Sequence, residues 1–165
     1  MKEKNYHRSL FRIFISYFGA HKKLFIIDMS CAFMVSMIDV AFPLVSRFAM
    51  YDLLPGKLYR AFFTVMAIMA AAFVLRSVFY YVITYLGHRF GIYVEADIRE
   101  DLYQHFQALD FEFFDRNRTG KLMNRLTGDL FEITELAHHG PEDLLISIAT
   151  IVGALIVMFA VQWQL

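Results

Sequence analysis

The chain has 165 residues, of which 58% are hydrophobic and 18 are Phe, and its formal net charge is zero. A soluble domain of this length usually has a smaller apolar fraction and mixes it more evenly with charged residues. The apolar residues are clustered here, which indicates a membrane protein, and the balanced charge provides no general attraction to nucleic acid. Cys31 is the only cysteine, so no disulfide can form within these residues.

Residues 1–23 are basic and carry apolar side chains at helical spacing, namely Leu10, Phe11, Phe14, Tyr17 and Phe18. This pattern predicts a short amphipathic helix in the headgroup region of a membrane. A signal peptide fits less well, because Arg12 interrupts the apolar run and no small-residue cleavage site follows. An ordinary juxtamembrane tail is the other reading.

Three apolar segments are predicted to cross the membrane, at about 24–54, 61–86 and 144–165. Pro43 favours a kink in the first segment. The second is roughly 39 Å long as a helix, which is enough to cross the hydrocarbon core. Because more Lys and Arg residues precede the first segment than follow it, the N-terminus is expected in the cytoplasm. A soluble helical bundle with a large apolar core is the alternative.

Five charged residues fall within the predicted membrane segments, namely Asp28, Asp39, Arg47, Asp52 and Arg76. Asp39 would lie about 22 Å from Leu24 along its helix and Arg76 about 24 Å from Arg60, so both are expected near the middle of the bilayer. Charges at this depth are costly and usually pair or face a cavity. The hypothesis is that Asp39 and Arg76 face each other or the substrate path. Structural pairing, including with helices outside these residues, is the alternative.

Residues 87–143 are predicted to form a cytosolic helical hairpin. Apolar residues recur every three to four positions from Val94 to Leu109 and again from Leu122 to Leu136. The second membrane helix is therefore expected to continue to about Leu109. A returning helix begins near Thr119 and leads into the third segment, with a kink at Gly140-Pro141. Such a hairpin projects on the order of 35 Å from the membrane.

The tip of this hairpin, residues 111–120, combines Phe111, Phe113 and Phe114 with charged residues. Exposed aromatic residues at the end of a hairpin are typical of a docking site. The alternative is that these rings only plug the end of the hairpin.

The polar residues of the tip have predicted local roles. Asp115 and Thr119 are suitable N-cap residues, and Gly120 would permit a close backbone approach. Arg116 and Arg118 can pair with carboxylates or phosphates on a partner.

The run EFFDRNRTGKLMNRLTGDLFEI, residues 112–133, resembles the first intracellular loop of ATP-binding cassette (ABC) exporters with six membrane helices per half. The matching positions are Phe113, Phe114, Asp115, Thr119, Gly120, Leu122, Arg125, Leu126, Thr127 and Asp129. Residues 97–114 also resemble the run into that loop. The resemblance implies an all-α membrane fold, of which these residues form the first three of six helices in a partial transmembrane domain, 24–165. It further implies that residues 111–120 form a coupling helix that docks on cytosolic nucleotide-binding domains.

The resemblance also implies roles for single residues. Phe113, Phe114 and Asp115 would dock on the nucleotide-binding domain, with Arg116 and Arg118 as further contacts. A second group is expected to hold the turn and hairpin together, namely Thr119, Gly120, Arg125 and Asp129. The complete transporter would hydrolyse ATP with Mg, pair with a second half as a homodimer or heterodimer, and lie in the bilayer of a bacterial plasma membrane.

Catalytic chemistry is not expected in these residues. The Gly-Lys pairs at 56–57 and 120–121 are both followed by Leu, so neither fits the phosphate-binding pattern G-x-x-x-x-G-K-[ST]. No catalytic triad is apparent. His138 and His139 are a poor chelating pair, because adjacent side chains on a helix diverge by about 100°. No catalytic, cofactor or metal residue is therefore predicted.

The expected function is the N-terminal part of an exporter membrane domain, without its nucleotide-binding domain. A non-transport membrane scaffold, or a truncated relic, whose hairpin binds another protein is the alternative. Nucleic acid is not an expected partner, because residues 87–143 carry twelve acidic residues against six Lys and Arg.

Overall fold

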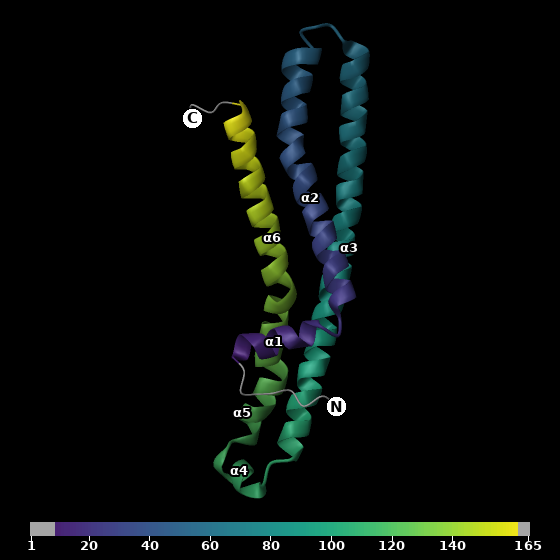
Figure 1. Cartoon of the computed structure of the whole chain (residues 1–165). Helices are drawn as coiled ribbons and strands as arrows, with labels where there is room; N and C mark the ends of the chain where they lie inside the picture. Colours follow the sequence, from purple (N-terminus) through teal and green to yellow (C-terminus); the bar gives the residue numbers. More distant parts are fainter. Residues whose placement is uncertain (1–8, 162–165) are drawn as a thin grey trace. The chain divides into compact units, whose positions relative to one another are not determined.

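The computed structural model describes residues 9–161, which form helices joined by short turns, without a strand. In chain order the elements are α1 Leu10–Phe18, α2 Lys22–Phe48, the π-helical turn η1 Ala49–Leu53, α3 Tyr59–Gln107, α4 Phe111–Arg116, α5 Thr119–Asn124, the π-helical turn η2 Arg125–Asp129 and α6 Leu130–Val161 (Figure 1). The predicted all-α class is confirmed. Two parts of the predictions lie outside the described residues: 1–8 of the basic segment and 162–165 of the third membrane segment.

Within the part of the chain that the structure describes, three helical stretches are long and apolar enough to cross a membrane, namely Lys22–Leu53, Tyr59–Gln107 and Thr119–Ala160. Each overlaps one of the predicted membrane segments, and Tyr59–Gln107 contains the whole of 61–86. With 49 residues, α3 is about 74 Å long, more than twice the roughly 30 Å hydrocarbon core. Gly87 and Gly91 do not interrupt it, because glycine only lowers helix propensity. The helix ends at Gln107, close to the predicted end near Leu109.

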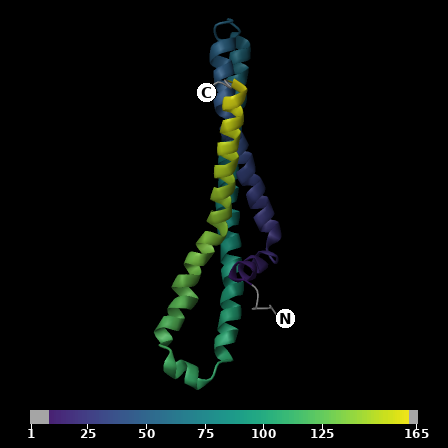
Figure 2. The same cartoon turned by 60° about the vertical axis from the view of Figure 1, so that its left-hand side comes forward.

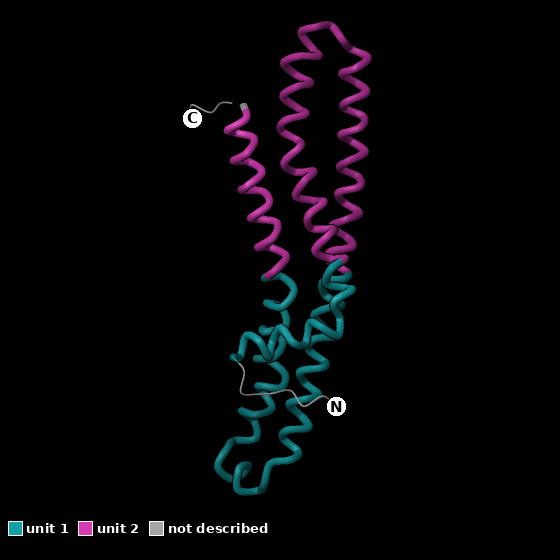
Figure 3. The backbone as a smooth tube through the Cα atoms, viewed as in Figure 1, with its two compact units in different colours: residues 1–26, 86–140 teal, residues 27–85, 141–165 magenta. Residues whose placement is uncertain are grey.

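The chain divides into two compact units, coloured separately in Figure 3. Unit 1 contains the described residues up to 26 together with 86–140. Unit 2 contains residues 27–85 and the described residues from 141 onward. Because α2, α3 and α6 are long, each contributes residues to both units.

The core of unit 1 is an aromatic cluster where α1 and the start of α2 meet α3. The Phe18 and Phe90 rings lie edge to face with centroids 5.0 Å apart, and the Phe25 ring is 5.3 Å from that of Phe90. The Tyr17 hydroxyl donates a hydrogen bond of 2.8 Å to Asp101 Oδ2. These contacts anchor α1 through one face, while Leu10 and Phe11 on the rest of the helix remain exposed. An apolar exposed face is what an interfacial helix presents to lipid.

The core of unit 2 is formed by small and branched residues of α2 and α3. Ala32, Val35 and Ile83 are almost completely buried, and Leu145 of α6 packs against them. Gly153 of α6 also lies close to α2, since a Cβ atom at this position would come within 2.8 Å of Val40 Cγ2. Small residues at such a contact allow two helices to approach closely.

Candidate functional site

The end of the hairpin in unit 1 is closed by the short helix α4, which lies between the end of α3 and the start of α5 (Figure 2). Asp110 precedes α4 in an extended conformation, and its side chain accepts a hydrogen bond of 3.0 Å from the Phe113 backbone N–H. Asp110 is therefore the N-cap. The predicted N-cap role of Asp115 is wrong, because Asp115 lies inside α4. Thr119 is likewise the first residue of α5 rather than its N-cap, which is Arg118.

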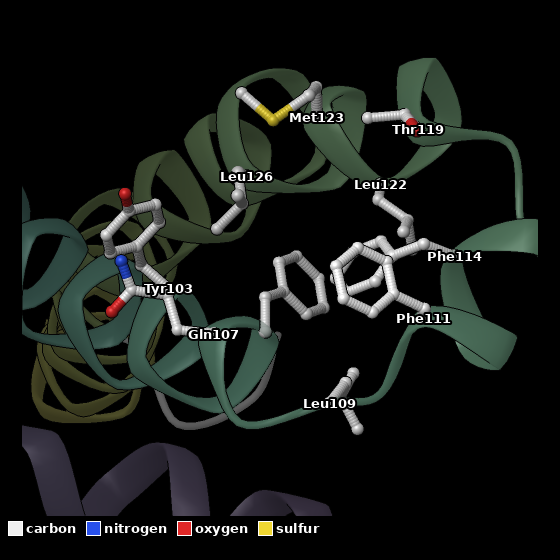
Figure 4. Close-up of a pocket in the computed structure, with 10 residues that line it drawn as sticks. Tyr103, Gln107, Leu109, Phe111, Phe114, Thr119, Leu122, Met123 and Leu126 are labelled. Carbon is white, nitrogen blue, oxygen red and sulfur yellow. The ribbon is translucent and has the colours of Figure 1, made fainter.

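The three aromatic residues of the tip have different environments. Phe111 is 89% exposed, whereas Phe113 and Phe114 are half-buried and their rings pack edge to face at 5.5 Å. Phe111 and Phe114 both line an apolar cavity of about 400 Å³, open to the surroundings, which is formed by residues of α3, α4, α5 and η2. In Figure 4 the side chains of Phe114 and Leu122 face into this cavity. Phe114 thus helps to close the hairpin, while Phe111, although it lines the same cavity, remains largely exposed.

The charged residues of the tip lie on its surface. Asp115, Arg116 and Arg118 are all exposed. Arg116 forms an ion pair with Glu112, one turn earlier in α4. An exposed pair of this kind contributes little to stability. These side chains therefore remain available for a partner at little cost to the fold.

The residues predicted to hold the hairpin together differ in their surroundings. Thr119 lines the tip cavity. Asp129 Oδ1 accepts a hydrogen bond of 3.0 Å from Asn124 Nδ2 across the η2 turn. Arg125, the first residue of η2, is exposed. A Cβ atom at Gly120 would meet nothing within 4 Å, so the structure provides no close backbone approach there.

Arg99 of α3 is a hairpin contact that sequence reasoning missed. Its Nε donates a hydrogen bond of 3.2 Å to the Leu126 carbonyl in η2, and its guanidinium also pairs with Glu95. A π-helical turn shifts the hydrogen-bonding pattern of a helix and can leave a carbonyl available. The Glu95–Arg99 spacing is visible in the sequence, but the link to Leu126 depends on the two helices meeting.

The structure brings Asp39 of α2 and Arg76 of α3 together within unit 2. Arg76 Nε lies 2.6 Å from Asp39 Oδ1, and Arg76 Nη2 lies 3.0 Å from Asp39 Oδ2. This is the two-pronged geometry in which guanidinium and carboxylate bind most strongly. The guanidinium carbon also lies 4.7 Å from the centre of the Tyr80 ring, a cation–π contact.

Three histidines of unit 1 also come together. His88 of α3 and the pair His138-His139 of α6 place one possible ligand atom each within 4.8 Å of one another. The sequence-based argument against metal binding considered only the adjacent pair. His88 was missed because it lies fifty residues earlier in the chain and joins the pair only through helix packing.

Comparison with known families agrees with this arrangement. The family described as ABC transporter transmembrane region matches residues 25–165. A Bacillus subtilis (strain 168) protein named "Uncharacterized ABC transporter ATP-binding protein YwjA" is 42% identical over 156 residues, which cover 94% of this chain and 27% of the relative. A second protein of that strain, "Uncharacterized ABC transporter ATP-binding protein YknU", is 27% identical over 129 residues, covering 78% of this chain and 22% of the relative.

A third relative is the "ATP-dependent lipid A-core flippase" of Haemophilus ducreyi (strain 35000HP / ATCC 700724). It is 33% identical over 115 residues, which cover 67% of this chain and 19% of the flippase. The chain thus spans between 19% and 27% of the length of these curated relatives. The family match covers most of the chain and coincides with its long apolar helices. The chain therefore belongs to the ABC transporter transmembrane region family and is part of an integral membrane protein.

Proposed function

We propose that this chain is the N-terminal part of the membrane domain of an ATP-driven ABC exporter, and that residues 111–120 couple it to nucleotide-binding domains. The observation that carries the proposal is the tip of the hairpin. A capped short helix there holds an exposed aromatic ring, Phe111, beside exposed Asp115 and Arg118. Aromatic and Arg residues at such a surface are the side chains most often responsible for binding energy at protein interfaces.

The proposed docking residues are Phe113, Asp115, Arg116 and Arg118, with Phe114 supporting them from inside the cavity. Phe111 is added to these proposed docking residues because its side chain is largely exposed at the same tip. Thr119 and Asp129 would keep the loop attached to the hairpin through the cavity wall and the Asn124 hydrogen bond. Gly120 and Arg125 belong to the matched motif and complete the proposed hairpin set.

The proposed membrane segments are residues 24–54, 61–86 and 144–165, with the N-terminus and the hairpin 87–143 in the cytoplasm of a bacterium. Since α3 and α6 each contribute residues to both compact units, a displacement of the loop can pass along continuous helices. Packed helices move as units rather than deforming locally. ATP and Mg would bind to the nucleotide-binding domains, and a second transporter half would complete the substrate pathway.

The test is ATP hydrolysis by the chain in the longest form that its gene encodes, purified in detergent. Phe113→Ala removes the central proposed docking ring. We expect ATP hydrolysis to fall at least about tenfold, because truncating a central interface aromatic residue commonly costs 2 kcal/mol or more. The matched control is Phe131→Ala, which removes a ring that is 55% exposed on α6 outside the loop.

Circular dichroism should give the same helix content for both variants. Equal ATP hydrolysis by the Phe113→Ala variant and the wild type would contradict docking through the loop. A gene product without ATP hydrolysis would favour a membrane scaffold instead.

A further inference from the structure

We propose that His88, His138 and His139 form a binding site for a first-row divalent transition-metal ion, with zinc as the preferred occupant. The three residues come from two helices of unit 1, and one possible ligand atom from each lies within 4.8 Å of the other two. The ring centres of His88 and His138 are 4.9 Å apart, and those of His138 and His139 are 4.1 Å apart. Imidazole nitrogens suit zinc, copper and nickel, whereas magnesium and calcium require oxygen ligands.

A hydrogen bond of His138 fixes the tautomer in which one ring nitrogen can bind a metal ion. His138 Nδ1 lies 3.2 Å from the Thr134 carbonyl oxygen. Because a carbonyl can only accept, Nδ1 carries the proton, and Nε2 of the neutral ring presents a lone pair. A backbone carbonyl bonded to one ring nitrogen is the usual arrangement that fixes the tautomer and orientation of a metal-bound histidine.

The other nitrogen of His138, Nε2, has no hydrogen-bond partner among residues 9–161. The residue is only 2% exposed, and Nε2 is a buried atom without a hydrogen bond among the described residues. Leaving a buried polar atom unsatisfied costs about 1–3 kcal/mol, so such atoms are rare and require an explanation. A metal ion bound at this lone pair provides one.

The surrounding helix packing favours ligation of the same ring. Gly91 of α3 faces His138, and a Cβ atom there would lie 3.0 Å from His138 Nδ1. The absence of a side chain at Gly91 therefore lets the ring fit between α3 and α6. His139 Nε2 also lies 3.6 Å from Glu135 Oε2. A carboxylate beside a histidine commonly orients it as a ligand.

The spacing matches tetrahedral coordination after a small adjustment. Zinc–nitrogen bonds of about 2.0–2.1 Å place two tetrahedral ligand atoms roughly 3.4 Å apart. The distance between any two of the three histidine ligand atoms, now at most 4.8 Å, therefore has to shorten by at most about 1.5 Å, through small movements of both side chains. His88 and His139 are exposed, which gives the ion a route of entry. Three histidines leave a fourth position for water, and the ion would join α3 to α6 at the base of the hairpin.

The test is cobalt binding to the chain in the longest form that its gene encodes, purified in detergent without a polyhistidine tag and stripped with a chelator. Cobalt(II) in a tetrahedral nitrogen site has strong visible absorption, whereas the hydrated ion absorbs weakly. We expect a saturable visible band, corresponding to a single ion per chain, that zinc abolishes by competition. His88→Gln and His139→Gln should each weaken cobalt binding by more than about 100-fold, and Glu135→Gln by about tenfold.

His105→Gln is the matched control, because His105 is an exposed histidine in the last turn of α3 outside the cluster. This variant should bind cobalt as the wild type does. A second measurement is thermal unfolding, in which zinc should raise the Tm of the wild type and of His105→Gln but not that of His88→Gln. Absence of a tetrahedral cobalt band in the wild type would overturn the proposal. Binding that is unchanged in both His88→Gln and His139→Gln would also overturn it.

Discussion

The Asp39–Arg76 pair provides a quantitative test of the membrane placement of unit 2. Both Arg76 nitrogens in contact with Asp39 lie within 3.0 Å of its carboxylate oxygens, and both residues are expected near the middle of the bilayer. Arg76→Met removes one partner and leaves a carboxylate without its counter-ion in a low-dielectric environment. Breaking a buried pair in this way costs about 3–5 kcal/mol. The insertion cost of a single charge at a helix centre, about 2.5–3.5 kcal/mol, has the same magnitude.

The assay is a double-mutant cycle in mixed detergent micelles, with the free energy of unfolding measured for Asp39→Asn, Arg76→Met and the double variant. Replacing both charges leaves no uncompensated charge. The double variant should therefore be more stable than Arg76→Met alone, and the coupling energy should be about 2 kcal/mol or more. Additive losses, with a coupling energy under about 0.5 kcal/mol, would refute the reasoning.

The same variants distinguish a structural role from a place on the substrate path. The Arg76→Met variant of the complete transporter should be assayed for transport. If transport of every tested substrate is unchanged, a role of Arg76 on the substrate path is excluded. Altered substrate preference in the double variant, with its helix content checked by circular dichroism, would support that role.

Five further substitutions test the packing of both units by thermal unfolding. Gly120→Ala should not destabilise the hairpin and should raise stability by up to about 1 kcal/mol, because the position is helical and faces open space; a loss of stability would show that Gly120 does make a close contact. Phe114→Ala should lower the free energy of unfolding by about 2 kcal/mol, because it enlarges the tip cavity. Phe111→Ala removes an exposed ring and should lower it by less than about 0.5 kcal/mol. Equal losses of stability would contradict the inward role of Phe114. Gly153→Leu should lower the free energy of unfolding by about 1–3 kcal/mol through its clash with Val40, whereas Gly120→Leu should leave stability unchanged. If Gly153→Leu were as stable as the wild type, close packing of α6 on α2 would be contradicted.

Much of the fold could be predicted, because each long helix has its own sequence signal. Continuous apolar runs indicate the membrane segments, and the change to amphipathic periodicity beyond Gly87 predicts that α3 continues past the bilayer. The start of the returning helix at Thr119 was also predicted correctly. These signals are local, so a single sequence carries them in full.

The details that depend on contacts between helices could not be predicted in this way. Asp110 and Asp115 are both acceptable N-caps by residue type, and only the backbone conformation selects Asp110. The hydrogen bond from Arg99 to Leu126 and the approach of His88 to His138 join residues of α3 to residues far along the chain. No periodicity within one helix reports such pairs. The π-helical turns have no residue signature of their own and were likewise not foreseen.

The central claim is that residues 111–120 dock on a nucleotide-binding domain. The most direct measurement is photocross-linking from a reactive side chain at Phe113 in the longest form of the protein, with the same group at Phe131 as control. We expect a cross-link from position 113 to a nucleotide-binding domain, identified by mass spectrometry, and a different cross-link yield after ATP is added. No such cross-link from position 113, or an equal yield from position 131, would contradict the claim.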